Sequence, residues 1–247
     1  MKHRFQRLEF LIGNSGISVL KNKHVAVFGV GGVGSFTIEA LARAGVGTIT
    51  IVDYDIVDLT NINRQIHAND KTVGMVKVEA MAARLRDINP DLDVRAVNQM
   101  ILPENADAFF DANQFDYLVD AIDMVTGKIE LVMQASKRSI PIVASMGTGN
   151  KLDPSRLKIS DIYKTSICPL ARVMRRELKA RGVKSLKVVY SDETPITPDH
   201  SSMDQIPSVG RKAPPGSCSF VPSSAGLFLA SVVVNDLLNE VELVDIM

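Results

Sequence analysis

A glycine-rich run, GVGGVGS from Gly29 to Ser35, is the feature that most constrains the fold of this chain. It follows a short β-branched run at 24–30 and precedes a helical pattern at 34–45 that stops at a glycine, as helix ends often do. Such a loop is typical of nucleotide-binding α/β folds, because the free N–H groups and positive dipole end of the helix suit a phosphate. The run therefore predicts a phosphate-binding loop.

The spacing of the glycines predicts a separate role for each. Gly29, Gly31 and Gly34 fit G-x-G-x-x-G, and Gly32 lies inside the same loop. The pattern needs glycine for a tight turn, for close approach of the backbone to phosphate, and for close packing of helix on strand. Asp53 ends the next strand-like run, where a carboxylate binds a ribose hydroxyl in this pattern. The loop alone does not choose between a dinucleotide and ATP.

Strand-like and helical segments alternate through the first part of the chain. Strand-like runs stand at 48–55, 92–97, 116–122 and 140–146, with an amphipathic helical pattern at 74–89 and others between the later strands. Such alternation predicts a mostly parallel sheet covered by helices on both faces. We therefore expect a Rossmann-like α/β fold whose nucleotide-binding half is residues 1–147.

The pattern of the sequence changes near residue 147, but no linker separates the two parts of the chain. We predict a single domain, 1–247, whose C-terminal half, 148–247, continues the sheet. The stretch 192–217 is rich in Pro and Ser and lacks apolar periodicity, which predicts a long mobile loop. The remaining expected elements are strands at 157–165 and 185–193, a basic helix at 169–182, and a buried closing helix at 223–238.

Composition excludes several classes of protein. The chain has 247 residues, 46% of them hydrophobic, and a formal net charge of zero, so no overall field indicates nucleic acid. Its two cysteines, Cys168 and Cys218, argue against a disulfide scaffold or a zinc ribbon, and we expect small buried or incidental thiols. The first residues lack a signal-peptide core, and no apolar run reaches the length of a membrane span. These features predict a soluble cytoplasmic protein.

The polar segment after the second strand-like run helps to choose between a dinucleotide and ATP. An arginine and a lysine near a phosphate loop suit the β- and γ-phosphates of ATP, whereas a nicotinamide enzyme needs nothing basic there unless it must hold a 2′-phosphate. Singly, the basic residues also fit solvated surface charges, and the asparagines fit turn residues or a helix cap. Their joint placement at one sheet edge favours an ATP site made by Asp53, Asp55, Asn61, Asn63, Arg64 and Lys77.

A further carboxylate, Asp123, follows the fourth expected strand. It would lie at the carboxyl ends of the parallel strands, where ligands bind in open α/β sheets. A carboxylate there suits Mg²⁺ bound to phosphates, although a cap for the next helix is the alternative.

These pieces resemble the ubiquitin-activating-like (ThiF/MoeB/HesA-type) adenylating enzymes. The matching segments are RFQRLEFLIG, GVGGVGS, IVDYDIVDLTNINRQ, VGMVKVEAMAARLRDINP and VDAIDM, in the family's order over about half of the chain. The resemblance implies that the glycine loop and Asp53 hold ATP and that Asp123 is linked to Mg²⁺. It implies that Asn61, Asn63, Arg64 and Lys77 contact the phosphates or the reacting carboxylate. It also implies an obligate homodimer in which Arg7 enters the active site of the other subunit.

Within that family the chain is most similar to the branch that dehydrates threonylcarbamoyladenosine beside the tRNA anticodon. NINRQIHA and YSDETP favour this branch, and the paired Cys-x-x-Cys motifs of carrier-protein activators are absent. The implied reaction is adenylation of the threonylcarbamoyl carboxylate by ATP, followed by ring closure and release of AMP. Adenylation of a ubiquitin-like sulfur carrier, an NAD-dependent oxidoreductase and a silent nucleotide-binding scaffold are the alternatives. The resemblance leaves open a bound Na⁺ or K⁺ and a sulfur-transfer partner.

One local charge asymmetry predicts a tRNA contact. Seven basic residues and one acid lie between Ala171 and Lys187, so this window carries +6 and the rest of the chain −6. A basic helix face suits a phosphate backbone, and a solvated surface is the alternative. The residues that share this face at helical spacing are Arg172, Arg175, Arg176 and Lys179.

Overall fold

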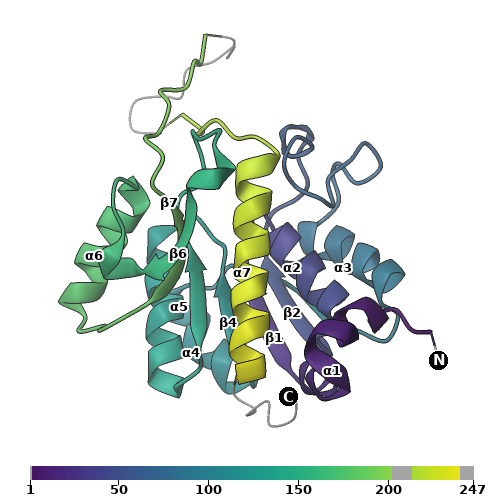
Figure 1. Cartoon of the computed structure of the whole chain (residues 1–247). Helices are drawn as coiled ribbons and strands as arrows, with labels where there is room; N and C mark the ends of the chain where they lie inside the picture. The colour runs from purple at the N-terminus through teal and green to yellow at the C-terminus, as the bar shows by residue number, and fades with distance from the viewer. Residues whose placement is uncertain (1, 202–212, 240–247) are drawn as a thin grey trace.

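The computed structural model describes residues 2–201 and 213–239, and its centre is one seven-stranded sheet of order β3-β2-β1-β4-β5-β7-β6 (Figure 1). Every neighbouring pair is parallel except β6 with β7, so the predicted mostly parallel α/β fold is confirmed. The strands are β1 His24–Phe28, β2 Thr48–Asp53, β3 Asp93–Asn98, β4 Tyr117–Asp120, β5 Ile142–Ser145, β6 Leu157–Asp161 and β7 Lys187–Ser191.

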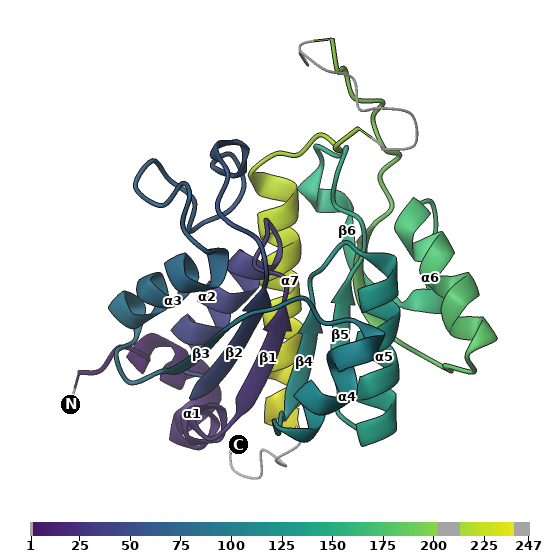
Figure 2. The ribbon, with the colours of Figure 1, turned by 180° about the vertical axis from the view of Figure 1, so that it is seen from behind.

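Helices cover both faces of the sheet (Figures 1 and 2). One face carries α1 Gln6–Lys21, α2 Gly34–Ala44, α3 Lys77–Ile88 and α7 Phe220–Asn239. The other carries α4 Pro103–Asp111, α5 Val125–Arg138 and α6 Pro169–Ala180. Three short 3₁₀ turns complete the described elements: η1 Leu59–Asn61, η2 Pro154–Arg156 and η3 Ile162–Lys164. Buried apolar clusters fill both layers between sheet and helices.

Local features shift two of the predicted boundaries, and one helix was not predicted. The helix predicted at 74–89 begins only at Lys77, since Gly74 takes a left-handed conformation with φ +87°. The strand predicted at 157–165 ends at Asp161, because the carboxylate of that residue caps η3 through Tyr163 N. Helix α1, which periodicity did not reveal, is interrupted at Gly13, where φ is +70°.

Helix α7 packs against α2 at the centre of one face. A Cβ on Gly226 would lie 2.3 Å from the Val33 carbonyl oxygen, and the Thr37 hydroxyl donates to the Gly226 carbonyl at 3.0 Å. Against our sequence prediction, α7 is long and apolar enough to cross a membrane, the one such helix among residues 2–201 and 213–239. More than half of it is buried inside the molecule, as predicted for a closing core helix.

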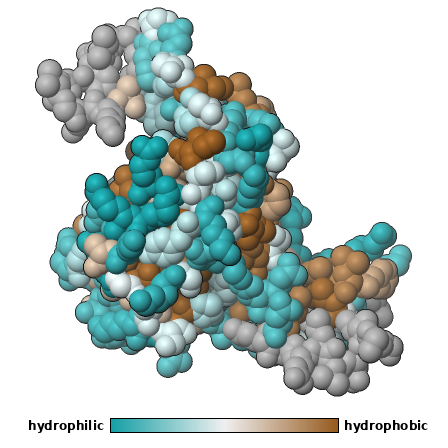
Figure 3. Space-filling view, turned by 60° about the vertical axis from the view of Figure 1, so that its left-hand side comes forward, coloured by the Kyte–Doolittle hydropathy of each residue, from teal (hydrophilic) through white to brown (hydrophobic). Residues whose placement is uncertain are grey.

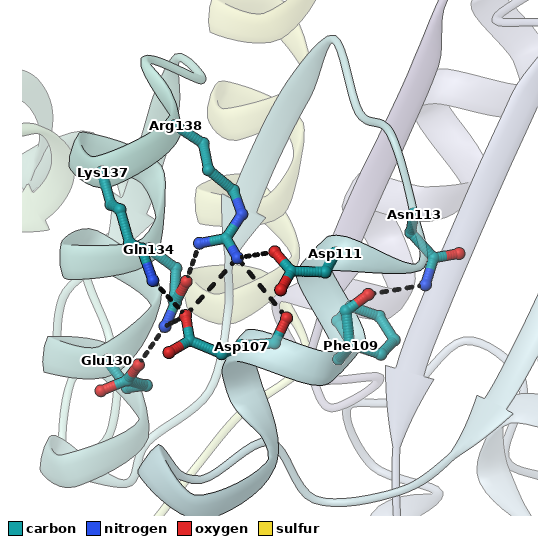
Figure 4. A network of polar contacts seen from close by, with 8 residues as sticks. All are labelled: Asp107, Phe109, Asp111, Asn113, Glu130, Gln134, Lys137 and Arg138. Carbon is teal, nitrogen blue, oxygen red and sulfur yellow. Dashed lines mark hydrogen bonds and ion pairs between the residues drawn. The ribbon is translucent and has the colours of Figure 1, made fainter.

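A polar network joins α4 to α5 on the opposite face (Figure 4). Arg138 donates to Asp111 and Gln134 and lies over the Phe110 ring at 5.4 Å. Lys137 donates to Asp107 at 2.6 Å. These contacts hold α4 against the C-terminal half of α5.

Candidate active site

The carboxyl ends of the strands surround a cavity of about 660 Å³. It lies where β1 and β4 neighbour each other and the strand order reverses, which is the ligand-binding position of open α/β sheets. The glycine loop, the segment after β2, the β4–α5 turn and the segment after β5 all contribute lining residues. The cavity therefore collects the regions in which the sequence placed its candidates.

The glycine loop has the geometry that its spacing predicted. Gly29 has φ +93°, where a side chain would be strained. A Cβ on Gly34 would lie 1.8 Å from the Gly29 carbonyl oxygen, so only glycine lets the helix pack there. A Cβ on Gly31 would meet nothing within 4 Å, because this position faces the cavity, and Gly32 lies beside Arg64. Gly31 thus leaves room for a ligand to approach the backbone of the loop.

The Asp53 carboxylate accepts hydrogen bonds from two backbone N–H groups near the cavity. Its carboxylate accepts from Val30 N at 2.6 Å and from Asp55 N at 2.9 Å. These bonds tie the end of β2 to the start of the glycine loop, so Asp53 fixes the loop in addition to lining the cavity. The sequence pattern indicated the ribose role but not this structural one.

Asp55 and Lys77 form an ion pair at the cavity wall. The Lys77 ammonium donates to the Asp55 carboxylate at 2.8 Å, and the lysine side chain is only 8% exposed. Lys77 is the first residue of α3, so its ammonium lies beside the positive end of that helix. The ammonium and the helix N-terminus are two positive features at this wall, and the Asp55 carboxylate offsets part of their charge.

The three predicted polar residues of the crossover segment have different positions. Asn61 is buried and lines the cavity, and its side-chain oxygen accepts from Asp58 N at 3.1 Å to complete the cap of η1. Arg64 lines the cavity and donates to the Thr60 carbonyl at 2.8 Å. Asn63 is outside the cavity lining and donates to the Ser217 carbonyl at 3.0 Å.

Asp123 lies exposed at the cavity and is not a helix cap. The N-cap of α5 is Met124, which makes no side-chain capping bond, so the alternative reading of Asp123 is wrong. Burial raises the pKa of Tyr54, and the carboxylates of Asp55, Asp123 and Asp53 raise it further. The phenol of Tyr54 therefore stays protonated at the rim of the cavity, among three carboxylates.

The donor set at Asp123 fits a nucleotide-bound Mg²⁺. Within residues 2–201 and 213–239 no three His, Cys, Asp or Glu side chains form a metal cluster. Mg²⁺ on a nucleotide needs only one or two carboxylates, since phosphates and water supply the other ligands. An exposed carboxylate free of a capping role meets that need.

A buried ion pair under the β4–α5 turn escaped sequence reasoning. Lys128 and Asp120 are both fully buried, and the lysine ammonium lies 2.9 Å from a carboxylate oxygen. The same ammonium donates to the carbonyls of Ile122 at 3.1 Å and Ser145 at 2.8 Å. Burial raises the pKa of Asp120, and Lys128 opposes this effect. Lysine is so often exposed that its position in an amphipathic helix gave no signal of this role.

Lys151 is another buried lysine that lines the cavity. Its ammonium donates to the carbonyls of Gly147 at 3.1 Å and Ser191 at 3.0 Å. Burial lowers the pKa of Lys151, while the nearby Cys168, Glu193 and Asp192 raise it in part. Cys168 is buried as predicted and lines the cavity.

Cys218 is half-buried, and its thiol donates to the Lys151 carbonyl at 3.5 Å. Cys218 directly follows the predicted loop 192–217. Residues 202–212 of that loop lie outside the described part of the chain. The described flanks are held by hydrogen bonds to the segment that follows β5.

The predicted basic face lies on α6, which begins at the cavity. Cys168, Pro169 and Leu170 line the cavity, and the helix carries its basic residues away from it. Figure 3 turns this side forward and shows many hydrophilic residues over it. Arg175 donates to the Thr165 carbonyl at 2.9 Å, which leaves Arg172, Arg176 and Lys179 exposed on the face.

Arg7 lies exposed on α1 and is not among the residues that line the cavity of its own chain. The structure therefore does not bring Arg7 together with the other candidate residues. This separation is expected of a residue that acts in another subunit.

Comparison with known proteins places the chain among a consistent set of relatives. Residues 5–187 match the ThiF family. The chain is 47% identical to a tRNA threonylcarbamoyladenosine dehydratase of Bacillus subtilis (strain 168), over 98% of both chains. It also matches crystal structures of the Escherichia coli dehydratase TcdA in complex with ATP and with AMP. Identity to both is 33%, coverage is 96% of this chain and 94% of theirs, and the TM-scores are 0.85 and 0.86.

Proposed function

Because the chain belongs to the ThiF family, we propose that it is an ATP-dependent tRNA threonylcarbamoyladenosine dehydratase. The observation that carries the proposal is the 47% identity, over 98% of both chains, to a relative with this activity. In agreement with it, one cavity of this chain is lined by the glycine loop, Arg64, Lys77 and Asp123. ATP-bound and AMP-bound crystal structures of the E. coli relative fit the same interpretation. An NAD-dependent oxidoreductase gives no role to Arg64 and Lys77.

The first step is adenylation of the threonylcarbamoyl carboxylate. Its oxygen attacks the α-phosphorus of ATP, a new C–O–P linkage forms, and pyrophosphate leaves. Arg64 and Lys77 stabilise the negative charge that grows on the phosphates in the transition state. The glycine loop and the α2 N-terminus hold the phosphates through backbone N–H groups.

The second step is ring closure. A nucleophilic atom of the same side chain bonds to the acyl carbon and loses its proton, and AMP departs. Net water is lost from the nucleoside. Because the reaction is intramolecular, the protein mainly has to position the two groups and exclude water.

We propose Mg²⁺ as the metal cofactor, held by Asp123 together with the nucleotide phosphates. The ion neutralises phosphate charge when it is bound. The exposed position of Asp123 at the cavity, without a capping bond, supports this assignment. Asp123 then serves to orient the phosphates relative to Lys77.

We propose that tRNA lies along α6 with the modified nucleoside in the cavity. The first turn of α6 lines the cavity, and Arg172, Arg176 and Lys179 follow along the same helix. With a rise of about 1.5 Å per residue, this face reaches roughly 10 Å outward, enough to meet more than one phosphate. Direct contact by Arg175 is less favoured, since Thr165 already binds it.

We also propose that the enzyme acts as a cytoplasmic homodimer in which Arg7 completes the site of the other subunit. Support comes from the exposed position of Arg7 outside the cavity of its own chain. An Arg7→Ala subunit mixed with an active-site Lys77→Ala subunit tests this. Recovered activity in the mixed dimer is expected, and absence of any recovery contradicts action across subunits.

The function is tested by incubation with ATP, Mg²⁺ and tRNA that carries threonylcarbamoyladenosine. The expected result is loss of one water from the nucleoside by mass analysis, with formation of AMP and pyrophosphate. No change in this tRNA, with adenylation of a ubiquitin-like carrier protein instead, would overturn the proposal in favour of the carrier-activating alternative.

A further inference from the structure

Asn150 joins two chain segments at the mouth of the cavity. Its backbone N–H donates to the Gly216 carbonyl at 2.8 Å, and its side-chain oxygen accepts from Gly216 N at 2.6 Å. Its own carbonyl accepts from Ile196 N at 2.8 Å. One residue therefore holds the segment after β7 and the segment before α7 together.

The backbone of Asn150 suits this position. Its φ of +60° is left-handed, a conformation that asparagine tolerates better than most other non-glycine residues. The neighbouring Gly149 is packed closely, because a Cβ there would lie 3.0 Å from Pro215 Cβ. The turn at 147–151 is thus shaped to receive the 214–217 segment.

Asn63, in the crossover segment after β2, also holds this segment. Its amide donates to the Ser217 carbonyl at 3.0 Å, one residue beyond the contact of Asn150. Pro215 and Ser217 line the cavity, together with Asn150 itself. The segment 214–217 therefore forms part of the cavity wall, and it is tied both to the crossover segment and to the turn after β5.

We infer that Asn150 is a positioning residue that holds this wall in place so that water does not reach the acyl-adenylate. The inference rests on the proposed dehydratase function. If water attacks the acyl carbon, the bond to the phosphate oxygen breaks, AMP leaves and the original carboxylate is regenerated. ATP is then consumed without any change in the nucleoside. A well-held wall suppresses this loss and leaves ring closure as the favoured path.

The test measures AMP formed for each cyclised nucleoside. Asn150→Ala removes the side-chain acceptor and disfavours the left-handed backbone. Asn150→Gly restores the backbone freedom but still lacks the acceptor, whereas Asn150→Asp keeps an acceptor oxygen. The matched control is Asn113→Ala, which loses the bond from the Asn113 amide, just after α4, to the Phe109 carbonyl within α4 (Figure 4).

We expect Asn150→Ala and Asn150→Gly to raise the ratio of AMP to product about fivefold, the effect of losing one ordinary hydrogen bond. Asn150→Asp and Asn113→Ala should retain the wild-type ratio. An unchanged ratio in Asn150→Gly, or an equal rise in Asn150→Asp, would overturn the inference. Wild-type protein that forms no AMP with this tRNA would instead contradict the proposed function.

Hydrogen exchange gives a readout that does not depend on the reaction. Gly216 N–H donates to the Asn150 side chain, so its protection should fall in Asn150→Gly and persist in Asn150→Asp. Thermal melting of each variant identifies any that do not fold, and a folded Asn150→Gly with unchanged exchange at Gly216 would also overturn the inference.

Discussion

Lys77 is tied to Asp55 twice: its ammonium donates to the carboxylate at 2.8 Å, and its backbone N–H donates to the Asp55 carbonyl at 3.0 Å. The backbone bond fixes the start of α3, and the side-chain bond aims the ammonium along the cavity wall. A substitution of the Lys77 side chain therefore leaves the backbone bond to Asp55 intact and removes the side-chain bond.

Lys77→Ala is expected to lower kcat/KM for adenylation by about 10²–10³-fold, as removal of one electrostatic stabiliser of a transition state does. The free energy of unfolding should change little, because alanine is a good helix former and the backbone bond remains. Arg64→Ala should behave similarly. tRNA-dependent ATP–pyrophosphate exchange measures the effect, with exposed Lys71→Ala as control. Exchange near the wild-type rate in Lys77→Ala would contradict the role of this lysine.

Two alanine substitutions in the glycine loop should separate binding from folding. Gly34→Ala places a Cβ 1.8 Å from the Gly29 carbonyl oxygen and is expected to destabilise the protein. Gly31→Ala meets nothing within 4 Å, so the protein should fold normally while the methyl group blocks phosphate approach. Urea unfolding and ATP titration distinguish the two. Tight ATP binding by Gly31→Ala would place the phosphates elsewhere.

Charge reversal on α6 should weaken tRNA binding and leave nucleotide binding unchanged. Reversal of Arg175 would also break its bond to Thr165, so Arg172→Glu with Lys179→Glu is the cleaner pair. Loss of each phosphate contact should reduce the slope of log Kd against log salt concentration by about one. Exposed Arg86→Glu, in the last turn of α3, is the matched control. Equal tRNA affinity in the double variant and this control would identify the face as ordinary surface.

His67 should make stability depend on pH. Burial, together with the nearby charges of Lys77 and Arg84, lowers its pKa from 6.5 to about 4. Between these two pH values the unfolded chain binds more protons than the folded chain does. The contribution of neutral His67 to the free energy of unfolding is therefore fully present above pH 6.5 and is lost as pH falls toward 4. The loss attributable to His67 amounts to at most about 3 kcal/mol.

The comparison for His67 is His67→Gln, which does not titrate. Urea midpoints measured from pH 7 down to pH 4 should fall less steeply in this variant than in the wild type. His24 titrates in both proteins and cancels from the difference. Parallel curves would show that His67 is not held neutral in the folded state.

The elements that could be predicted from sequence are those with a strong local requirement. Gly29 and Gly34 admit no other residue in their positions, so their spacing revealed the loop and its neighbours. Apolar runs revealed the buried strands, because a parallel sheet covered on both faces needs them. Asp123 was found for the same reason, since the end of a parallel strand has a known place in such a sheet.

The residues that could not be predicted act through contacts distant in sequence. Asn150 binds Ile196 and Gly216, and no pattern near position 150 indicates either partner. Lys128 and Lys151 are buried because backbone carbonyls surround their ammonium groups, which only the folded chain brings together. Helical spacing assigned Arg175 to the tRNA face, but in the structure its side chain donates to Thr165, a residue that precedes α6.

Asp53 accepts two backbone N–H groups, from Val30 and Asp55, so both of its bonds are made within the protein. Because the protein itself supplies these bonds, the shape of the glycine loop does not depend on a nucleotide, and little backbone entropy remains to be lost on binding. Association with ATP should accordingly carry a small entropic penalty, and most of the available binding energy goes to holding the phosphates in line rather than to assembling the loop.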